Sequence, residues 1–375
     1  MRKLHLIVSF YFLFVLSSFA QTFSNKTFLC DTCDREISLQ IESTSFIKNN
    51  EYFNAFTKGF TGLGFFLKPT LQYYFTKNTQ VSAGVFLLKY DGIDLFTQAI
   101  PVFTIRQKIM PNLELVIGSI YGTLNHQLEE PLFRFDRYYQ NNVENGFQLL
   151  YHSAKIKSDL WLNWEKFIYV NSPYQEEFVL GNTSQFLLLQ TKRLSIELPF
   201  HLMGVHRGGQ IDSSPNPAIS IINAMTGLDI KYNIGTKQSL SFKPLFFLYR
   251  GLGLPESGVN SLPFKKGNGM YLKVHYQNKN MLSVFGYWSS NKFISSRGEY
   301  LFLSISDFDA DFFQEKRQLL TSKTEMEFPI SESIKLVIRA EAYFDLMSLN
   351  FAHSFGTYFI INESFFLKKI KANRN

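Results

Sequence analysis

The sequence predicts a single transmembrane antiparallel up-and-down β-barrel of about sixteen strands, with fourteen as the other count. Short periplasmic turns and long extracellular loops are expected to join the strands. Three observations predict this all-β fold: the composition is aromatic and poor in charge, apolar and polar residues alternate in segment after segment, and short turns alternate with long connections.

The composition is unusual for a soluble domain. The 375 residues include 40 Phe and 19 Tyr, and charged residues make up 18% of the chain, against roughly 25% in soluble domains. After residue 20, no stretch reaches the roughly 18 apolar residues that a membrane-spanning helix requires. Such a chain is expected to cross a membrane as a closed sheet, because lipid leaves every backbone polar group dependent on an internal hydrogen bond.

The N-terminus predicts export. Arg2 and Lys3 precede the apolar run 4–16, and small residues follow as far as Ala20, so residues 1–20 are predicted to be a signal peptide. Without this segment the formal net charge falls from +7 to +5. That mild excess is spread along the chain and predicts no nucleic-acid partner.

The period of two is clearest in residues 334–346. The even positions are all apolar: Ile334, Leu336, Ile338, Ala340, Ala342, Phe344 and Leu346. Successive side chains of a strand point to opposite faces, so this strand has an apolar face and a charged face. In a soluble sandwich the charged face would meet solvent, whereas in a membrane barrel it faces the lumen.

The same pattern elsewhere assigns charges of both signs to the lumen. The predicted lumen-facing residues are Asp159, Glu197, His201, Asp229, Lys231, Lys273, His275, Lys323, Glu325, Glu327, Lys335, Arg339, Glu341 and Asp345. These side chains must be hydrated or paired, because a bare buried charge is costly. The lumen is therefore predicted either to hold water or to be cross-linked by ion pairs.

Turn spacing favours the barrel over a sandwich. Short polar turns are predicted at 76–79, 110–112, 153–155, 191–193, 235–237, 278–280 and 331–333. Longer connections lie at 46–60, 125–142, 166–176, 207–219, 250–267 and 289–315. This alternation, with strands of about ten residues, is typical of outer-membrane barrels. Residues 301–306 fit either a strand or a hairpin within the last connection, which is one reason why the count could be fourteen.

These boundaries divide the chain into parts. The barrel is predicted to occupy residues 36–367, with 36–46 as its first strand and 355–366 as its last. Residues 21–35 are predicted to form an N-terminal periplasmic segment, and residues 368–375 a basic C-terminal tail.

Cys30 and Cys33 are the only cysteines, in C-x-x-C spacing. A lipid-anchor cysteine would directly follow the apolar run, and here a polar spacer intervenes. Zinc needs about four ligands, and a thioredoxin-type pair needs a βαβ context, neither of which the surrounding sequence provides. Because export permits disulfides, a small local disulfide is predicted, or else two idle thiols. No cofactor and no metal are predicted.

Several runs resemble a family of uncharacterised outer-membrane barrels of the phylum Bacteroidota. They are FIKNNEYF (46–53), GLGFFLKPTLQY (62–73), YGTLNHQLEEPLFRFDRYY (121–139), ENGFQLLY (144–151), DLWLNWEKFIY (159–169) and PFHLMGVHRGGQID (199–212). The resemblance covers most of the first two thirds of the chain. It implies a porin-like barrel in the outer membrane of a Gram-negative cell, and it implies no activity and no functional residue.

Polar residues concentrate at the predicted outer ends of the strands. The candidates for an extracellular rim are His126, Glu129, Glu130, Arg134, Asp136, Arg137, His206, Arg207 and Asp212. They could form a binding or catalytic rim, because they come from consecutive hairpins. The other interpretation is that ion pairs among them hold the loops folded over the mouth, as exposed pairs do at little net energy.

No catalytic set is predicted, and we expect the protein not to be an enzyme. His206 and Asp212 are available, but Ser213 and Ser214 beside Pro215 look like turn residues. The predicted function is a porin-like channel for polar solutes with a mixed-charge lumen. The alternative is a non-catalytic structural or interaction subunit of a larger outer-membrane complex, for barrel assembly or secretion. The expected partners are outer-membrane lipid and other outer-membrane or periplasmic subunits.

Overall fold

The computed structural model describes residues 22–371. The predicted signal peptide, residues 1–20, and residues 372–375 of the predicted tail lie outside the described residues. Strands make up nearly all of the regular structure, and no helix within the described part of the chain has the length and apolar character to cross a membrane.

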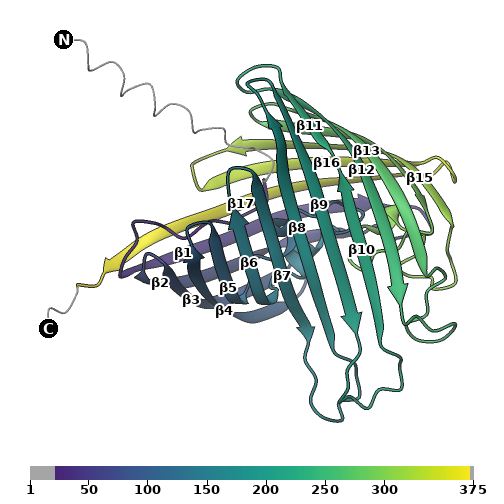
Figure 1. The fold of residues 1–375 in the computed structure, drawn as a ribbon, viewed down its shortest axis with the longest axis horizontal. Coiled ribbons are helices and arrows are strands. Elements are labelled where there is room, and N and C mark those ends of the chain that lie inside the picture. The colour runs from purple at the N-terminus through teal and green to yellow at the C-terminus, as the bar shows by residue number, and fades with distance from the viewer. Residues whose placement is uncertain (1–21, 372–375) are drawn as a thin grey trace.

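All strand segments belong to one antiparallel sheet. In chain order they are β1 (Glu36–Glu51), β2 (Thr61–Thr76), β3 (Thr79–Tyr90), β4 (Gln98–Met110), β5 (Leu113–Ser119), β6 (Asn145–His152), β7 (Ile156–Lys166), β8 (Glu177–Gln190), β9 (Leu194–Arg207), β10 (Ile219–Gly227), β11 (Asp229–Asn233), β12 (Ser239–Leu252), β13 (Lys266–Gln277), β14 (Met281–Asn291), β15 (Lys316–Pro329), β16 (Ile334–Asp345) and β17 (Phe351–Lys369). Consecutive strands pair with each other, except β10 and β11, which both pair with β9 and β12; Figure 1 shows the strands side by side.

The sheet closes on itself. β1 pairs with β2 on one side and with β17 on the other. β10 and β11 both lie between β9 and β12, so they form one strand of the wall, interrupted at Leu228. The predicted closed antiparallel barrel of sixteen strands is confirmed. β1 and β17 both run further toward the extracellular end than the predicted first and last strands, because the alternation continues beyond Phe46 and begins before Phe355.

Connections are short at one end of the barrel and long at the other, as the turn spacing predicted. The ambiguous residues 301–306 are not a wall strand. Residues Tyr300–Phe302 form a short 3-10 helix, η3, and Ile305 makes only an isolated bridge to Phe313 within the same long connection. By the usual rule for such barrels, the end with long loops is the extracellular end.

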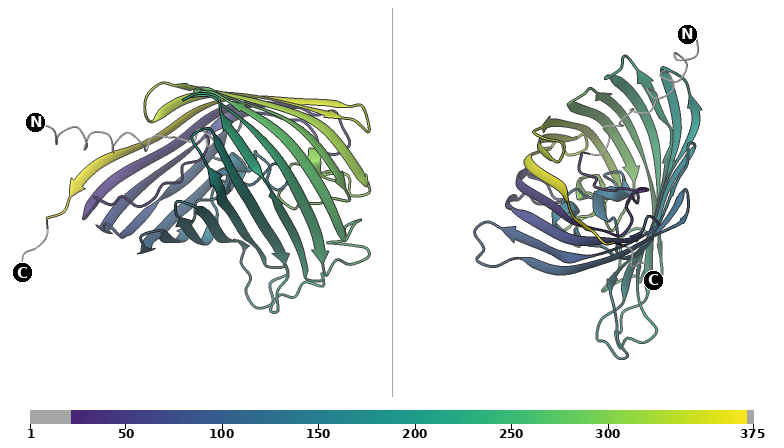
Figure 2. Two further views of the ribbon diagram at one scale, coloured as in Figure 1. Left: turned by 45° about the horizontal axis from the view of Figure 1, so that its top comes forward. Right: turned by 90° about the vertical axis from the view of Figure 1, so that its left-hand side faces the viewer.

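Two of the long connections fold into the barrel. We call residues 120–144 the plug loop, which contains the short helices η2 (Thr123–His126) and α1 (Arg137–Gln140), and residues 292–315 the inner loop. Figure 2 shows short segments lying inside the ring of strands. The two loops are joined by backbone hydrogen bonds, from the Arg134 N–H to the Arg297 carbonyl (2.7 Å) and from the Glu299 N–H to the Glu130 carbonyl (2.9 Å).

The hydrophobic core lies inside the barrel, between these loops and the wall. One cluster surrounds Leu132 of the plug loop and Phe302 of the inner loop, both fully buried against Trp288 of β14. A second cluster packs Tyr138 and Tyr139 of α1 against wall aromatics. A barrel of sixteen strands is wide enough to hold water. These apolar side chains occupy much of that interior instead.

The segment before β1 also enters the barrel, and we call residues 22–35 the N-terminal strap. Ser24 Oγ donates to Asn125 Oδ1 (2.8 Å), and the Leu29 N–H donates to Glu114 Oε2 (3.1 Å). The expected periplasmic segment therefore has its first part in the lumen, because inward-facing polar groups pair with it. Cys30 and Cys33 form a disulfide close to the start of β1.

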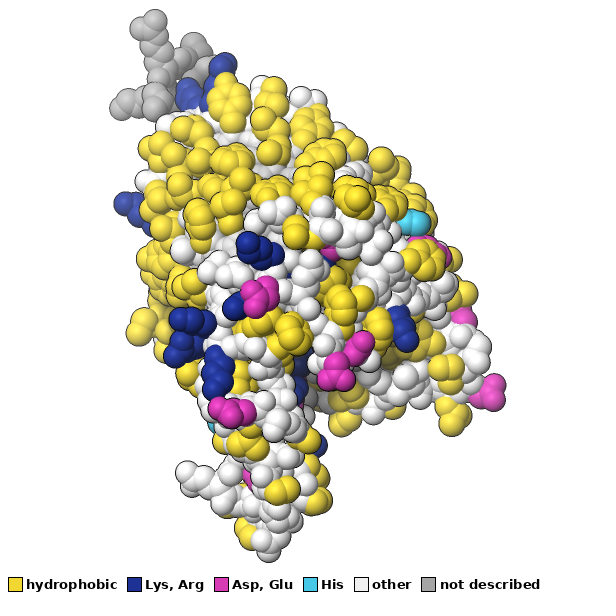
Figure 3. All heavy atoms as spheres, turned by 90° about the vertical axis from the view of Figure 1, so that its right-hand side faces the viewer, with side chains coloured by type: hydrophobic (Ala, Val, Ile, Leu, Met, Phe, Trp, Pro, Cys, Tyr) yellow, Lys and Arg dark blue, Asp and Glu magenta, His cyan; other side chains and the backbone are white. Residues whose placement is uncertain are grey.

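The C-terminal end differs from the expected tail in one respect. Lys368 and Lys369 belong to β17, and Lys369 Nζ lies 2.8 Å from Glu36 Oε1 at the start of β1. Outside the barrel, large apolar side chains are exposed on strand after strand, among them Phe246, Leu248 and Phe285. Figure 3 shows apolar side chains gathered over part of the surface, with charged side chains concentrated elsewhere.

The outward face of β16 provides a test of the membrane orientation. Ile338 lies in the middle of β16, next to the inward-facing Arg339. Ile338→Arg is expected to lower the free energy of unfolding by about 2–4 kcal/mol, since the new charge would face lipid near the midplane. Phe328→Arg, close to the short turn that follows β15, is the control and is expected to cost about 0–1 kcal/mol. Denaturant titrations in lipid vesicles measure both, and equal losses would contradict the assigned depth.

Candidate functional site

The structure places all fourteen predicted lumen residues on the inner face of the wall. The cross-strand register keeps them there: Asp229 lies opposite Glu197, Lys323 opposite Glu341, and Glu325 opposite Arg339. Many are paired, as in the 3.0 Å contact between Arg339 and Glu325. The inner face is therefore a network of charges, and the loops inside the barrel supply partners for it.

The expected extracellular rim needs correction. His126, Glu129, Glu130, Asp136 and Arg137 all belong to the plug loop, and their side chains contact the inner wall instead of forming the mouth. The reason is twofold: apolar plug residues such as Leu132 gain by burial, and the wall offers opposite charges. Arg134 lies in the same loop and is half-buried.

The remaining predicted rim residues do lie at the end with long loops. Arg207 ends β9 and pairs with Glu177 of β8 at 2.9 Å. Glu177 also pairs with Arg297 of the inner loop (2.9 Å), so the mouth carries an ion-pair network between wall and inner loop. His206 precedes Arg207 and faces the other side of the sheet, and Asp212 lies in the loop that follows β9.

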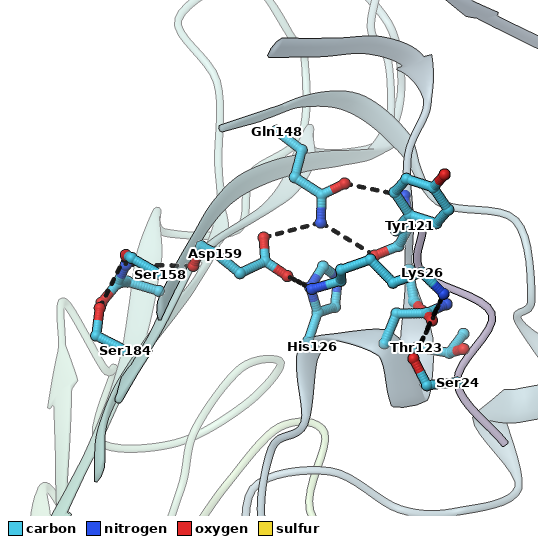
Figure 4. A network of polar contacts seen from close by, with 12 residues as sticks. Ser24, Lys26, Tyr121, Thr123, His126, Gln148, Ser158, Asp159 and Ser184 are labelled. Carbon is cyan, nitrogen blue, oxygen red and sulfur yellow. Dashed lines mark hydrogen bonds and ion pairs between the residues drawn. The ribbon is translucent and has the colours of Figure 1, made fainter. Parts of the chain in front are cut away.

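One polar network inside the barrel is centred on His126 (Figure 4). The ring nitrogens of His126 lie 3.1 Å from Asp159 Oδ2 and 3.2 Å from Glu144 Oε2. Lys26 of the strap reaches the same Asp159 oxygen at 2.6 Å. The His126 ring also stacks on Trp161, with 3.7 Å between ring centroids. The network thus joins the wall, the plug loop and the strap.

The pKa of His126 is raised above its ordinary value. Burial of the ring opposes protonation, but the carboxylates of Asp159 and Glu144 on either side of the ring outweigh that effect. An imidazolium between two carboxylates donates to both, so His126 acts as a charged crosslink. We assign this network to holding the plug loop in place.

A second group of contacts holds the tip of the plug loop. Glu129 Oε2 lies 2.7 Å from Lys273 Nζ, and Glu130 Oε1 lies 2.6 Å from Lys323 Nζ. Lys243 of β12 pairs with Asp229 of β11 at 2.6 Å. The acidic tip of the plug loop therefore lies against an inner wall rich in lysine.

A different arrangement lies on the outside of the barrel, near the extracellular end. His206 of β9 and Ser220 of β10 lie directly opposite each other in the register, and His206 Nδ1 is 2.9 Å from Ser220 Oγ. Both are half-buried, and both face outward, because Ile219 and Ile221 on either side of Ser220 are buried. The His206 ring packs against Phe178, with centroids 5.0 Å apart.

A serine hydroxyl within hydrogen-bond distance of an imidazole nitrogen is the arrangement that activates a nucleophile. With the proton on Nε2, the Nδ1 atom accepts the hydroxyl proton. The loop after β9 begins close to this pair. A β-carbon on Gly208, whose φ is +148°, would lie 2.4 Å from the Ala218 β-carbon and 3.5 Å from His206 Nε2. Gly208 therefore lets the loop return to β10 beside the histidine.

Ser220 and Lys26 are among the site residues that the sequence did not reveal. Ser220 was passed over because only serines close to His206 in the chain were weighed, and its partner lies across a loop. The alternation Ile219–Ser220–Ile221 could have revealed an outward hydroxyl. Lys26 was missed because the strap was expected to lie in the periplasm. Nothing in its local sequence indicates that it pairs with Asp159.

At least two cavities lie inside the periplasmic half of the barrel that residues 22–371 form. One, of about 340 Å³, lies between the strap and the wall and is lined by Asn25, Glu42, Lys68 and Lys335, among others. The other, of about 230 Å³, lies on the far side of Lys26 and reaches His201. Among residues 22–371, no group of three or more His, Cys, Asp or Glu is arranged to hold a metal ion.

Comparisons with known proteins identify the family. The model of a family described as lipid A 3'-O-deacylase-type matches residues 29–370. The chain belongs to this family. A search of curated proteins found no match to this chain. The origin of the chain in the phylum Bacteroidota, expected from the sequence, stays a prediction.

Solved structures with a similar fold are porin-like outer-membrane barrels. OprD of Pseudomonas aeruginosa has 9% identity and a TM-score of 0.53, covering 91% of this chain and 98% of OprD. An improved structure of OprD from the same organism has 10% identity and a TM-score of 0.54, covering 90% of this chain and 99% of OprD. A loop-deletion mutant of OmpT from Vibrio cholerae has 9% identity and a TM-score of 0.51, covering 87% of this chain and 99% of the mutant. At such identities the likeness shows the fold, and it supports the outer membrane as the location.

The family match corrects one prediction. From the sequence we expected the protein not to be an enzyme, whereas the family is described by an enzymatic activity and its model matches residues 29–370. The expectation rested on finding no serine and histidine close together in the chain. It gave no weight to pairs such as His206 and Ser220, which meet across two strands.

The His126 network predicts a pH dependence of stability. Because the folded-state pKa of His126 is raised, its contribution is fully present below the ordinary histidine pKa of about 6.5 and is lost as pH rises through the folded pKa. Between the ordinary pKa and the raised folded-state pKa of His126, the free energy of unfolding is expected to fall by about 1.4 kcal/mol per pH unit. His126→Gln should remove this slope, and His353→Gln, on the outer face, should keep it. Denaturant titrations at several pH values measure the slopes, and an unchanged slope in His126→Gln contradicts the assignment.

Proposed function

We propose that the protein is an outer-membrane ester hydrolase that removes an acyl chain from a glycolipid of the outer leaflet, lipid A being the first candidate. The pair of Ser220 and His206 carries this proposal. It lies on the outer face of the barrel near the end with long loops, where an outer-leaflet lipid would meet it. The family match over residues 29–370 supports the same reaction class.

The filled interior also favours chemistry on the outside. The plug loop, the inner loop and the strap occupy the lumen, and their contacts to the wall make the barrel a rigid support. A pair of side chains on two adjacent hydrogen-bonded strands is held in place by the sheet, and rigid elements position such pairs better than loops do.

The proposed reaction proceeds by acyl transfer in two steps. Ser220 Oγ attacks the ester carbonyl carbon while its proton passes to His206 Nδ1. The bond between that carbon and the alcohol oxygen breaks, and His206 returns the proton to the leaving alkoxide. Water then attacks the acyl-serine, gives its proton to His206, and releases a free fatty acid as Ser220 regains its proton. No cofactor is consumed.

Substitution of the pair tests the proposal. The purified full chain in vesicles containing lipid A is expected to release fatty acid, measured by mass spectrometry. Ser220→Ala and His206→Gln should each lower the rate at least about 100-fold, since a positioned base contributes roughly 10²–10⁴-fold.

Ser283 of β14 offers a matched control. It is also outward-facing, but its hydroxyl contacts Thr324 Oγ1 at 3.2 Å instead of a histidine. Ser283→Ala should keep the wild-type rate. An undiminished rate in Ser220→Ala, with the protein folded, would refute the assignment of the nucleophile.

A second candidate function is a gated, porin-like channel for polar solutes. The mixed-charge inner face favours it, together with the likeness of the fold to OprD. In this case the plug loop and inner loop are a gate held by ion pairs. Membership of a larger outer-membrane complex remains the alternative, and co-purification of stoichiometric unrelated chains would favour it.

Planar-bilayer recording tests the channel. If the gate opens, the wild-type protein should give discrete current steps whose size rises with salt concentration. Heat-denatured protein at the same concentration is the control. The absence of steps over the voltage range in which the membrane itself is stable would contradict conduction and leave the hydrolase unaffected.

A further inference from the structure

The inner wall carries a group of lysines on neighbouring strands. We call Lys231 (β11), Lys243 (β12), Lys273 (β13) and Lys323 (β15) the lysine wall. Lys243 and Lys273 lie directly opposite each other in the register. Like charges in directly opposite positions destabilise a sheet. Asp229 of the wall pairs with Lys243 at 2.6 Å, so it is Lys273 that needs negative charge from elsewhere.

The plug loop supplies that charge through two adjacent carboxylates. Glu129 contacts Lys273, whose side chain is only 4% exposed, and Glu130 contacts Lys323 and lies 4.0 Å from Arg339. Burial alone would raise the pKa of Glu130, but Lys323, Lys273 and Arg339 together lower it to about 2. Both plug carboxylates are thus ionised ligands of the wall.

Polar atoms beside the lysine wall are left without partners. Within the described residues, these buried atoms without a hydrogen bond include His201 Nδ1, His275 Nε2 and Asp229 Oδ1. His201, 4% exposed, lines the cavity of about 230 Å³ that also reaches Asp159 and His152. His201 thus has an unused hydrogen-bonding atom and connects the neighbourhood of the wall to a cavity, although none of the four lysines lines that cavity.

We propose that the lysine wall is a binding site for short dicarboxylates, and that Glu129 and Glu130 occupy it as a built-in ligand. Two carboxylates on neighbouring residues present the same two charges as a short dicarboxylate. The cations that bind them come from β13, β15 and β16, which the sheet holds in fixed register. A free dicarboxylate competes with the plug tip for these cations. The site is separate from the outer Ser220–His206 pair and does not depend on the hydrolase.

The double variant Glu129→Gln/Glu130→Gln tests the proposal by vacating the wall. Thermal unfolding of the full chain in detergent is followed with increasing succinate at constant ionic strength. The variant should show a saturable rise in Tm of several degrees, since a ligand that binds only the folded state stabilises it. The wild type should need at least about tenfold more succinate for the same rise, because its plug tip competes. Succinamide, which is uncharged, should have no effect on either protein.

A matched control removes two acids at the mouth. Glu165→Gln/Glu177→Gln takes partners from Arg297 but leaves the lysine wall occupied, so it should not gain succinate binding. Adding Lys273→Met to the plug double variant should abolish the gain. If the double variant does not fold, Glu129→Gln alone, which keeps the Glu130–Lys323 contact, is titrated by calorimetry. No saturable binding in the folded plug variants, or equal succinate binding in the plug double variant and the mouth control, overturns the proposal.

Discussion

The structure depends on one electrostatic constraint: charges that face the inside of the barrel must find partners there. Arg339, for example, is buried in β16 and contacts Glu325 and Glu341 of the wall as well as approaching Glu130 of the plug loop. Removing such charges from water is costly, and good geometry with several partners offsets that cost. The loops that fill the lumen are accordingly built with acids opposite lysines and a histidine between carboxylates.

This constraint also explains how polar and apolar interactions share the interior. The plug loop alternates short polar stretches with Leu132, Phe133 and Phe135, so the same loop binds charges on one side and forms a hydrophobic core on the other. The wall is thereby supported from within. A supported wall can present outward-facing side chains such as His206 and Ser220 in a steady geometry, which a hollow and compliant cylinder would do less well.

The fold was predictable from the sequence to a greater degree than the sites were. Alternation along residues 334–346 indicates which face each side chain takes, because the strand geometry is local. The path of a loop is different: whether Glu130 lies at the rim or meets Lys323 depends on residues far apart in the chain, and no local period records it. For the same reason Ser220 escaped notice beside His206. The strap was misplaced because its polar sequence suits solvent as well as a polar lumen.

The pairing of β1 with β17 has a consequence for biogenesis. The ring is joined by its first and last strands, so it cannot be completed until the C-terminal residues of the chain have been synthesised and delivered. Until then both strands expose unsatisfied edges that invite wrong association. A finished wall also bars entry from the side, so the strap and the two loops reach the interior either through the open ends or by being enclosed as the seam is sealed. The seam between β1 and β17 is therefore the step that separates these two routes of assembly.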